Sequence, residues 1–432
     1  MTDGTNRASR GWMIGVRRTD AGKMSGRTRW PWIAAALLMA VALGATPAQA
    51  QPPGGDADTR AAAIARAKAD KAKTVKVYEP NKAELWLDRA ETLLLAGGLR
   101  WHPFFDSAYA GGGFTLGAGY RRFVSPYNTI DGRGSITFSG YKRIEAEFLA
   151  PRLFNRRGLV SVIGGWREAT QVGFFGTGTS ETSKDGRANY SFTQPYVAGR
   201  IEVWPTRKLL VVRGGLEYSQ WNQGPGSGSA PSVEEVYTPE TLPGLGAKPT
   251  YLHAEGSAAL DWRTSAGYSR SGGMYGVSFH DFADHNSAFG FRRVDYEAIQ
   301  HIPLLRDAWV LSFRARAETT FTGDDEQIPF FMLPALGGGS SLRGFSSWRF
   351  RDQHSMLLQA EWRVLANRFL DMAVFYDAGK VMPRLADFTF EGLKSDYGLG
   401  FRLHGPAATP LRIELAKSNE GLAIVFSSKA AF

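Results

Sequence analysis

The stretch Tyr397-Gly-Leu-Gly-Phe-Arg-Leu-His404 decides the fold class of this 432-residue chain. Its odd positions are apolar or aromatic and include Leu399 and Phe401, whereas its even positions are glycine or polar and include Arg402 and His404. Successive side chains of a β-strand point to opposite faces, so a period of two separates an apolar face from a charged one. The stretch therefore predicts a strand with one apolar side and one hydrated side.

The same alternation recurs in Leu411–Leu415, Trp309–Glu318 and Leu252–Trp262. A soluble β-sandwich also alternates, so three further features are needed to choose between the two fold classes. The polar faces carry many charges, the segments run about ten to fourteen residues as tilted membrane strands do, and aromatics such as Trp204 and Trp362 lie near segment ends. Together these features predict an all-β, transmembrane antiparallel β-barrel.

About sixteen segments have this pattern, an even number within the range of bacterial barrels. Their approximate bounds are 98–109, 112–123, 132–139, 141–150, 158–170, 188–204, 208–220, 250–263, 273–283, 288–301, 308–320, 354–365, 370–381, 396–404, 410–417 and 421–432.

The lengths of the connections test this count. With both termini in the periplasm, odd-to-even connections face outside and should be long, while even-to-odd connections should be tight. The expected long connections are 171–187, 221–249, 321–353 and 382–395. The expected tight ones include 155–158, 205–207, 303–307, 366–369 and 405–410. Most of the ring has the expected contrast.

Residues 1–50 have the pattern of a secretion signal. Arg27 and Arg29 precede an apolar run from Trp32 to Leu43, and a small-residue motif predicts cleavage after Ala50. The apolar run is too short to span a bilayer as a helix. Met24 is an alternative start, which the sequence leaves open.

The remaining chain divides into two parts. Residues 51–96 are expected to form a periplasmic segment that is disordered or helical, with a helix predicted over 82–95 after Pro80. Residues 97–432 are expected to form the barrel. Beyond residue 50 there is no long apolar run, and the mean hydropathy of the whole chain is −0.24, so the pattern excludes a helical membrane protein.

The charge balance indicates no nucleic-acid partner. The chain has 51 Lys and Arg against 41 Asp and Glu, and removing residues 1–50 leaves 44 against 39, with both signs mixed along the strands. A nucleic-acid footprint would be a basic cluster with interleaved aromatics. There is no cysteine, so acylation on a cysteine after the signal is excluded.

The segment Leu336-Gly-Gly-Gly-Ser-Ser-Leu-Arg-Gly-Phe345 resembles the conserved loop of the BamA/TamA superfamily of outer-membrane assembly factors. Phe375–Val381, Tyr397–Arg402 and Pro410–Ala416 resemble late-strand motifs of that superfamily, and the terminal Phe432 completes the resemblance. The resemblance is specific over about residues 330–432 and rests on strand pattern alone over 97–330.

In that superfamily the long loop folds back into the lumen, where its arginine meets acidic residues. Alternation here places Glu361 and Asp377 on the inward faces of neighbouring strands, where a guanidinium fork could bind both. We therefore expect Arg343, Gly344 and Phe345 to lock the loop in the lumen against these two acids. The alternative is a solvated arginine beside ordinary lumen residues.

The last segment predicts an address for membrane assembly. Leu422, Ile424, Phe426 and Phe432 fall on one face of an extended strand that ends in an aromatic residue. This resembles the C-terminal signal by which such barrels are handed to the barrel assembly machinery, with Phe426 and Phe432 as its principal residues.

No constellation predicts an enzyme, a cofactor or a metal site. His280-Asp281 and Asp284-His285 come closest to a metal cluster, but alternation puts neighbouring residues on opposite faces. No nucleophile elbow or phosphate-binding loop is present. The expected catalytic, cofactor and metal residues are therefore none.

The resemblance implies a role in outer-membrane biogenesis, as insertion or translocation of protein or lipid. Residues 51–96 are too short for one of the periplasmic domains that recruit clients in the assembly members, so we expect a barrel without them. The implied mechanism is a weakly closed seam beside 112–123 and 421–432.

The alternative function is a passive or gated pore plugged by loop 321–353, since a barrel of this size otherwise has an aqueous lumen. An outer-membrane enzyme is a third, weaker reading. The expected partners are outer-membrane lipid, the assembly machinery during insertion, and a protein or lipid client that the sequence does not identify.

Overall fold

The computed structural model describes residues 63, 66–70 and 100–432, apart from 180, 181, 207, 208, 287, 306, 307 and 406. The predicted signal peptide, its cleavage site and the helix predicted over 82–95 lie outside the described residues. Residues 66–70 are helical. Within the described residues, no helix is long and apolar enough to cross a membrane.

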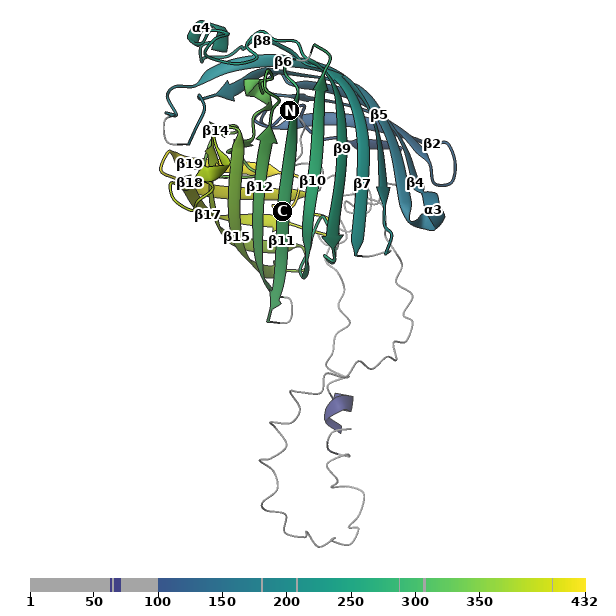
Figure 1. The fold of residues 1–432 in the computed structure, drawn as a ribbon. Coiled ribbons are helices and arrows are strands. Elements are labelled where there is room, and N and C mark those ends of the chain that lie inside the picture. The colour runs from purple at the N-terminus through teal and green to yellow at the C-terminus, as the bar shows by residue number, and fades with distance from the viewer. Residues whose placement is uncertain are drawn as a thin grey trace, which may run out of the picture. The chain divides into compact units, whose positions relative to one another are not determined.

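The described strands fall almost entirely in one antiparallel sheet of 17 strands (Figure 1). Sixteen of them pair each with the next along the chain and form a curved wall. They are β1 Trp101–Pro103, β2 Thr115–Phe123, β3 Thr129–Thr137, β4 Lys142–Arg152, β5 Gly158–Phe174, β6 Ala188–Val203, β7 Leu210–Gln220, β9 Thr250–Asp261, β10 Gly272–Asp284, β11 Phe291–Leu304, β12 Trp309–Phe321, β15 His354–Asn367, β16 Leu370–Met382, β17 Lys394–Leu403, β18 Leu411–Ser418 and β19 Gly421–Ser427.

The remaining elements are short. β8 Asn222–Pro225 follows β7 and pairs with β6. β13 Ala335–Leu336 and β14 Phe350–Arg351 form a separate two-stranded sheet inside the connection from β12 to β15. Four helical turns complete the set: α3 Leu153–Arg156, α4 Val233–Val236, η1 Phe330–Met332 and η2 Leu385–Asp387. The predicted all-β class and strand count are confirmed.

The two faces of the wall differ as the alternation predicts. On β16, Met372, Val374 and Tyr376 are about half exposed, whereas Asp371 and Asp377 on the other face are buried. The exposed face is the apolar one, which is the arrangement of a strand between lipid and an internal polar space. We call the inner face and the space it bounds the lumen.

The first segment is much shorter as a strand than the predicted 98–109. The last bond to β2 is donated by the N–H of Phe104 to the carbonyl of Gly117 at 2.9 Å, and Gly111 and Gly113, which precede β2, have left-handed φ angles of +93° and +76°. Between them the chain leaves the wall and reaches the lumen side, where Tyr109 is buried.

The last segment also ends early, at Ser427 rather than at Phe432. β18 begins at Leu411, and the ladder between β18 and β19 ends with Arg412 opposite Ser427. Only Leu411 of β18 lies beyond this last pair, so almost no length of β18 is left along which the ladder could continue. The face predicted over 422–432 is correct only as far as the strand continues.

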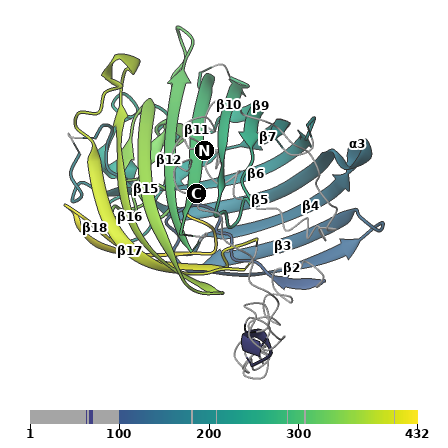
Figure 2. The same cartoon turned by 90° about the horizontal axis from the view of Figure 1, so that it is seen from below.

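The sheet has a seam where its first and last strands meet. The wall is not closed by a ladder there: among the described residues, no residue register joins β19 to β1 or β2. Figure 2 shows the sheet curving until its blue and yellow ends lie toward the same side of the view. One ion pair crosses the seam, with Lys429 Nζ 2.8 Å from Asp106 Oδ1.

An apolar core lies where the inner loops meet the ends of the wall strands. Its largest fully buried members include Phe174, Tyr190, Trp221, Phe330 and Phe331. Phe330 contacts Phe174 edge-on, with ring centroids 5.1 Å apart. This core is built partly from η1, so the connection from β12 to β15 is packed inside the sheet.

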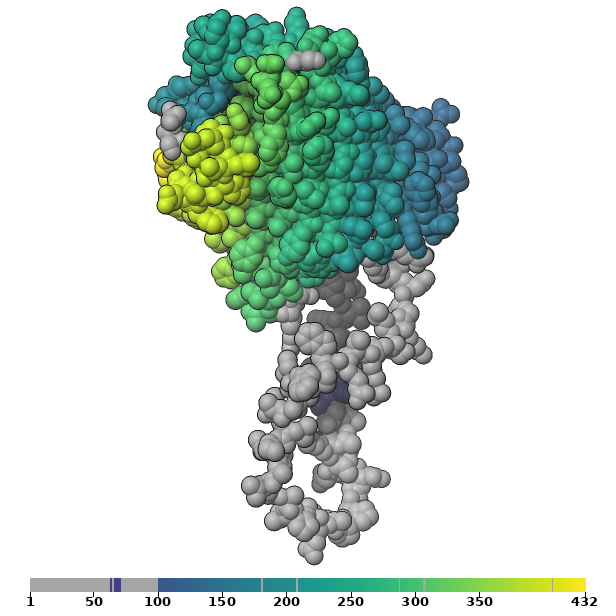
Figure 3. Space-filling view, in the orientation of Figure 1, coloured from purple at the N-terminus to yellow at the C-terminus, as the bar shows by residue number. Residues whose placement is uncertain are grey.

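The outer wall should tolerate charge poorly. Figure 3 shows that side chains cover the face of the wall formed by the teal and green strands. In lipid vesicles we expect Val374→Arg to lower the free energy of unfolding by about 2–4 kcal/mol if the residue lies near the bilayer midplane, and by less near an interface. Urea titration with tryptophan fluorescence measures the change.

The matched control is Phe390→Arg, since Phe390 is 73% exposed in the connection after β16. A Val374→Arg variant as stable as this control would contradict a lipid-facing β16.

Candidate functional site: the lumen loop and its arginine

Residues 322–353, which connect β12 to β15, form the candidate site, and we call them the lumen loop. The loop packs against the inner face of β15, β16 and β18. Its Arg343 side chain is completely buried, and the carboxylates of Glu361, Asp377 and Glu414 around it are 3%, 0% and 0% exposed. A charge buried so deeply needs compensation by partners of opposite charge.

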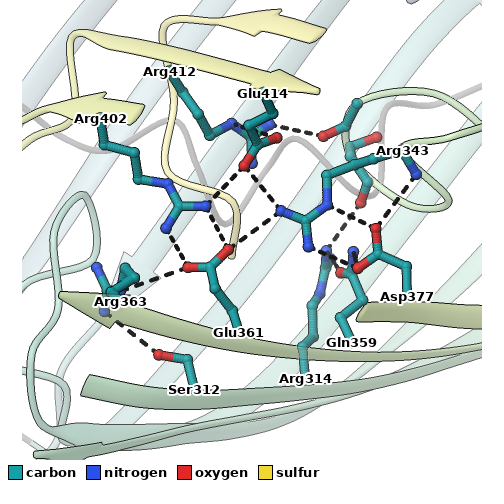
Figure 4. A network of polar contacts seen from close by, with 12 residues as sticks. Ser312, Arg314, Arg343, Gln359, Glu361, Arg363, Asp377, Arg402, Arg412 and Glu414 are labelled. Carbon is teal, nitrogen blue, oxygen red and sulfur yellow. Dashed lines mark hydrogen bonds and ion pairs between the residues drawn. The ribbon is translucent and has the colours of Figure 1, made fainter. Parts of the chain in front are cut away.

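The Arg343 guanidinium binds three carboxylates from three wall strands (Figure 4). Its Nε and Nη2 donate to the two oxygens of Asp377, each at 2.7 Å. Its Nη1 donates to Glu414 at 2.9 Å and to Glu361 at 3.2 Å. The two parallel bonds to Asp377 form the fork geometry that lysine cannot reproduce.

Further contacts fix this arrangement. The Arg343 guanidinium carbon lies 3.5 Å from the ring centroid of Phe375, a cation–π contact. Gln359 donates to Asp377 Oδ1 at 3.0 Å and to the carbonyl of Ser341 at 2.8 Å. Burial by itself lowers the pKa of Arg343, but the charges of Asp377, Glu414 and Glu361 raise that pKa above its usual value.

The acids around Arg343 are shared with a second arginine. Arg402 on β17 binds both Glu361 and Glu414, the latter at 2.8 Å. Glu361 is also 3.6 Å from Arg363, and Glu414 is 3.5 Å from Arg412. The loop arginine therefore enters a network of alternating charges.

The sequence identified Glu361 and Asp377, but it did not single out Glu414, Arg402 and Phe375. Alternation already placed Glu414 and Arg402 on a polar face. Their convergence depends on the strand register, with Arg402 opposite Arg412 and Glu414 opposite Gly400, which no local pattern specifies.

Gly344 and Phe345 are closely packed between the wall and the rest of the lumen loop. A Cβ on Gly344 would lie 2.6 Å from Asp396 Cβ and 3.1 Å from Ser418 Cβ, so only glycine allows this approach. The hydroxyl of Ser418 donates to the carbonyl of Gly344 at 2.8 Å. Phe345 is buried in an apolar cluster that includes Phe350, whose ring centroid is 5.2 Å away.

The loop also contacts the strands that border the seam. Arg412 on β18 donates to the carbonyl of Gly339 at 2.7 Å, and a Cβ on Gly339 would lie 2.7 Å from Val425 Cγ1 on β19. Arg349 donates to Glu420 in the β18–β19 turn at 2.8 Å. The loop therefore braces the last two strands from inside.

Trp348 links the loop to the other side of the seam. Its indole Nε1 donates to the carbonyl of Ala110 at 2.9 Å, and its ring stacks on Tyr109 with centroids 4.4 Å apart. Trp348 has a left-handed backbone with φ +63°. The lumen loop therefore contacts both edges of the sheet.

The structure places Phe426 and Phe432 in different surroundings. Phe426 lies on the outer face of β19 and is 65% exposed. Phe432 packs instead against a cluster containing Ala259, Met274 and Ile299 on the inner face. Their role as an assembly signal stays a prediction, and only Phe426 lies on the predicted outer face.

The lock predicts a strong effect of Arg343→Ala. Removing the guanidinium leaves three buried carboxylates without their shared partner, and breaking such a buried network costs about 3–5 kcal/mol. We expect the lumen loop to become cleavable by trypsin at Arg349 and Arg351, measured by mass spectrometry of the folded protein. Arg343→Lys should give a smaller effect because it keeps the charge without the fork.

Arg384→Ala is the control for this experiment, since Arg384 lies in an exposed i,i+3 pair with Asp387. Equal resistance of the lumen loop to trypsin in the Arg343→Ala and Arg384→Ala variants would show that Arg343 does not hold the loop in the lumen.

Gly344→Ala tests the packing without changing a charge. The added methyl group clashes with Asp396 and Ser418 and should destabilise the packed loop by about 1–3 kcal/mol. The same tryptic digestion should detect the release. Gly256→Ala is matched to it, because a Cβ on Gly256 meets nothing within 4 Å. Equal digestion of the two variants would show that the close approach at Gly344 does not hold the loop.

Comparison with known proteins finds one family match and several structures of similar fold. Residues 246–421 match the Omp85 superfamily domain. The fold is similar to BamA from Haemophilus ducreyi lacking POTRA domains 1-3, with TM-score 0.57 and 15% identity over 73% of this chain and 67% of that chain. It is also similar to CdiB from Escherichia coli, with TM-score 0.51 and 12% identity over 73% of this chain and 59% of that chain.

At these identities the structural likeness concerns the fold. No curated protein matches the chain. The Omp85 match covers the lumen loop, its acidic partners and the late strands, where the sequence motifs resemble the BamA/TamA superfamily. Residues 246–421 therefore form an Omp85 superfamily domain, and the chain is a β-barrel protein of the outer membrane of a diderm bacterium, similar in fold to BamA.

Proposed function

We propose that this protein inserts or translocates protein or lipid at the outer membrane through the seam between β19 and the first two strands. The observation that carries the proposal is the absence of a residue register across that seam among the described residues. Every other neighbouring pair of wall strands has a register, so this boundary is where the wall needs the fewest hydrogen bonds broken to open.

The strand edges at the seam could pair with a strand of a client protein that crosses the membrane there. β1 has three residues and β19 has seven, and strand edges offer unpaired N–H and C=O groups that can pair with another chain. The exposed face of β19 carries Leu422, Ile424 and Phe426, which keeps it in lipid. A client strand or a lipid chain at this edge would meet an apolar surface beside free backbone groups.

We regard the seam as a gate, and the lumen loop acts as a brace that holds its two edges together. It contacts β18, β19 and their turn on one side and Tyr109 and Ala110 on the other, so it holds both edges in place. The Arg343 network anchors the brace to the rigid part of the wall, on β15, β16 and β18. Seam opening then requires the two edges to separate while the anchor stays intact.

The domain assignment is part of the proposal. Residues 97–432 form the transmembrane unit, residues 1–50 direct secretion, and residues 51–96 form the periplasmic segment. The expected partners are outer-membrane lipid and a protein or lipid client, with the barrel assembly machinery acting on the chain during its own insertion. The protein is proposed to have no enzymatic activity.

A gated pore is the second candidate, favoured by the charged inner face of the wall. Arg133 with Glu145 and Glu147, and Arg213 with Glu202, are examples of ion pairs along this face. The lumen loop would then act as a plug. This candidate differs from the first because it needs no opening of the seam.

Locking the seam tests the proposal. The chain has no cysteine, so Asp106→Cys with Lys429→Cys provides one pair across the seam at the site of the ion pair. In cells depleted of the wild-type protein, a reducible thiol crosslinker on this pair should cause loss of specific outer-membrane proteins or of a lipid class. A reductant should restore them, as measured by quantitative proteomics and lipid analysis.

Arg384→Cys with Asp387→Cys is the matched control, since this pair lies within one exposed turn and does not cross the seam. Activity that survives crosslinking across the seam would overturn the gate. If depletion itself leaves proteins and lipids unchanged, the insertion role is overturned. The pore is then supported if deletion of 337–345 raises planar-bilayer conductance.

A further inference from the structure

A cluster of two histidines and a glutamate lies on the inner wall, away from the lumen loop's arginine. His253 and Glu255 are two residues apart on β9 and therefore share a face. His280 on β10 lies directly opposite Glu255 in the register. Both histidines are buried and Glu255 is partly buried.

The ligand atoms of these three side chains converge. His253 Nε2 is 3.0 Å from His280 Nδ1, and His280 Nδ1 is 3.9 Å from Glu255 Oε2. One nitrogen or oxygen atom from each residue lies within 4.8 Å of the others. Two nitrogens bound tetrahedrally to zinc at about 2.05 Å would be about 3.3 Å apart. The histidine nitrogens at 3.0 Å would therefore separate slightly on binding an ion, and the Glu255 side chain would turn toward them from 3.9 Å.

A second carboxylate supports one of the histidines from behind. Asp295 Oδ2 on β11 lies 3.4 Å from His280 Nε2, the ring nitrogen that faces away from His253. Metal-binding histidines usually donate their second ring N–H to such a carboxylate, which fixes the tautomer and leaves the other nitrogen free to bind. Asp295 is itself held by Arg293 at 3.1 Å.

Aromatic packing orients the other histidine. The rings of His253 and Phe282 are stacked, with centroids 4.1 Å apart and planes 4° apart. This stacking restrains the imidazole of His253, so its Nε2 stays directed at His280. The donors are therefore arranged before any ion arrives, which lowers the entropic cost of binding.

The space beside the cluster also permits a hydrated ion. A cavity of about 90 Å³ is lined by Glu255, His280, Asp295 and Arg316, among other residues, which is enough for an ion and its water ligands. Glu255 uses Oε1 toward Arg200 at 3.5 Å and Oε2 toward His280. One of its oxygens is therefore directed at the cluster.

We propose that His253, Glu255 and His280 bind a divalent first-row transition metal, with zinc as the reference ion. Two imidazoles and one carboxylate are a donor set that such metals accept, with water completing the coordination. The ion would link β9 to β10 through their side chains. The site would lie near the start of β9, directly after the long connection 226–249.

The competing arrangement is a hydrogen bond between the two imidazoles. In that state His253 Nε2–H donates to His280 Nδ1, while His280 Nε2–H donates to Asp295. Metal binding requires the proton of His253 to move to Nδ1, so that Nε2 and the Nδ1 of His280 both present lone pairs. The two states differ in one tautomer.

Titration of the purified full chain in detergent with Zn²⁺ tests the proposal, with Co²⁺ absorption reporting the coordination geometry. We expect one ion per chain and a rise of the thermal transition on binding. His280→Ala and His253→Ala should each weaken Zn²⁺ binding by at least about tenfold, and Asp295→Asn by about 10- to 100-fold through loss of the supporting carboxylate.

His301→Ala and His285→Ala are the controls. His301 is a buried wall histidine bonded to Ser312, and His285 is exposed beyond β10, so neither should change the affinity. Folding of each variant is checked by the heat-induced shift of the barrel in gel electrophoresis. Zn²⁺ binding that is absent from the wild type, or that persists unchanged in a folded His253→Ala/His280→Ala variant, would overturn the site.

Discussion

The packing of the lumen loop depends on compensating one buried positive charge. An unpaired guanidinium inside the sheet would cost several kcal/mol, so Arg343 can occupy the lumen only where carboxylates already converge. Asp377, Glu361 and Glu414 come from β16, β15 and β18, and the arginine therefore ties three wall strands to one point of the loop. Gly344 fits this arrangement, because the backbone next to Arg343 lies so close to Asp396 and Ser418 that a Cβ would clash with them.

The wall was largely predictable because each strand carries its own two-residue period. Thr250–Asp261 and Leu370–Met382 agree with the predicted segments to within two residues, since a shift by one residue would turn every charge toward lipid. The prediction failed at the two edges. β1 ends at Pro103 and β19 ends at Ser427, where their ladders with the neighbouring strands stop, and neither end is visible in an alternation pattern.

The site was predictable in part for the same reason. Inward orientation of Glu361 and Asp377 follows from local alternation, and the resemblance of Leu342–Phe345 to a known loop indicated where the arginine belongs. Convergence of residues from distant strands requires the register and curvature of the whole sheet. Glu414 and His253 illustrate this limit: each was on a recognisable polar face, but the partners Arg343 and His280 become neighbours only after the wall has formed.

Trp348 gives the loop a mechanical property. A large residue in the left-handed region costs about 1–2 kcal/mol of backbone strain, and such strain persists only where surrounding contacts impose it. The backbone here lies in a turn within the loop, closed by the Arg349 N–H, which donates to the carbonyl of Ser346 at 3.2 Å. The strain of that turn presents the indole to Tyr109 and Ala110 at the other edge of the sheet. Separation of the edges would therefore cost the loop its contact with Tyr109 and Ala110 while the turn itself stays closed, so the fluorescence of Trp348 would report whether the two edges are together.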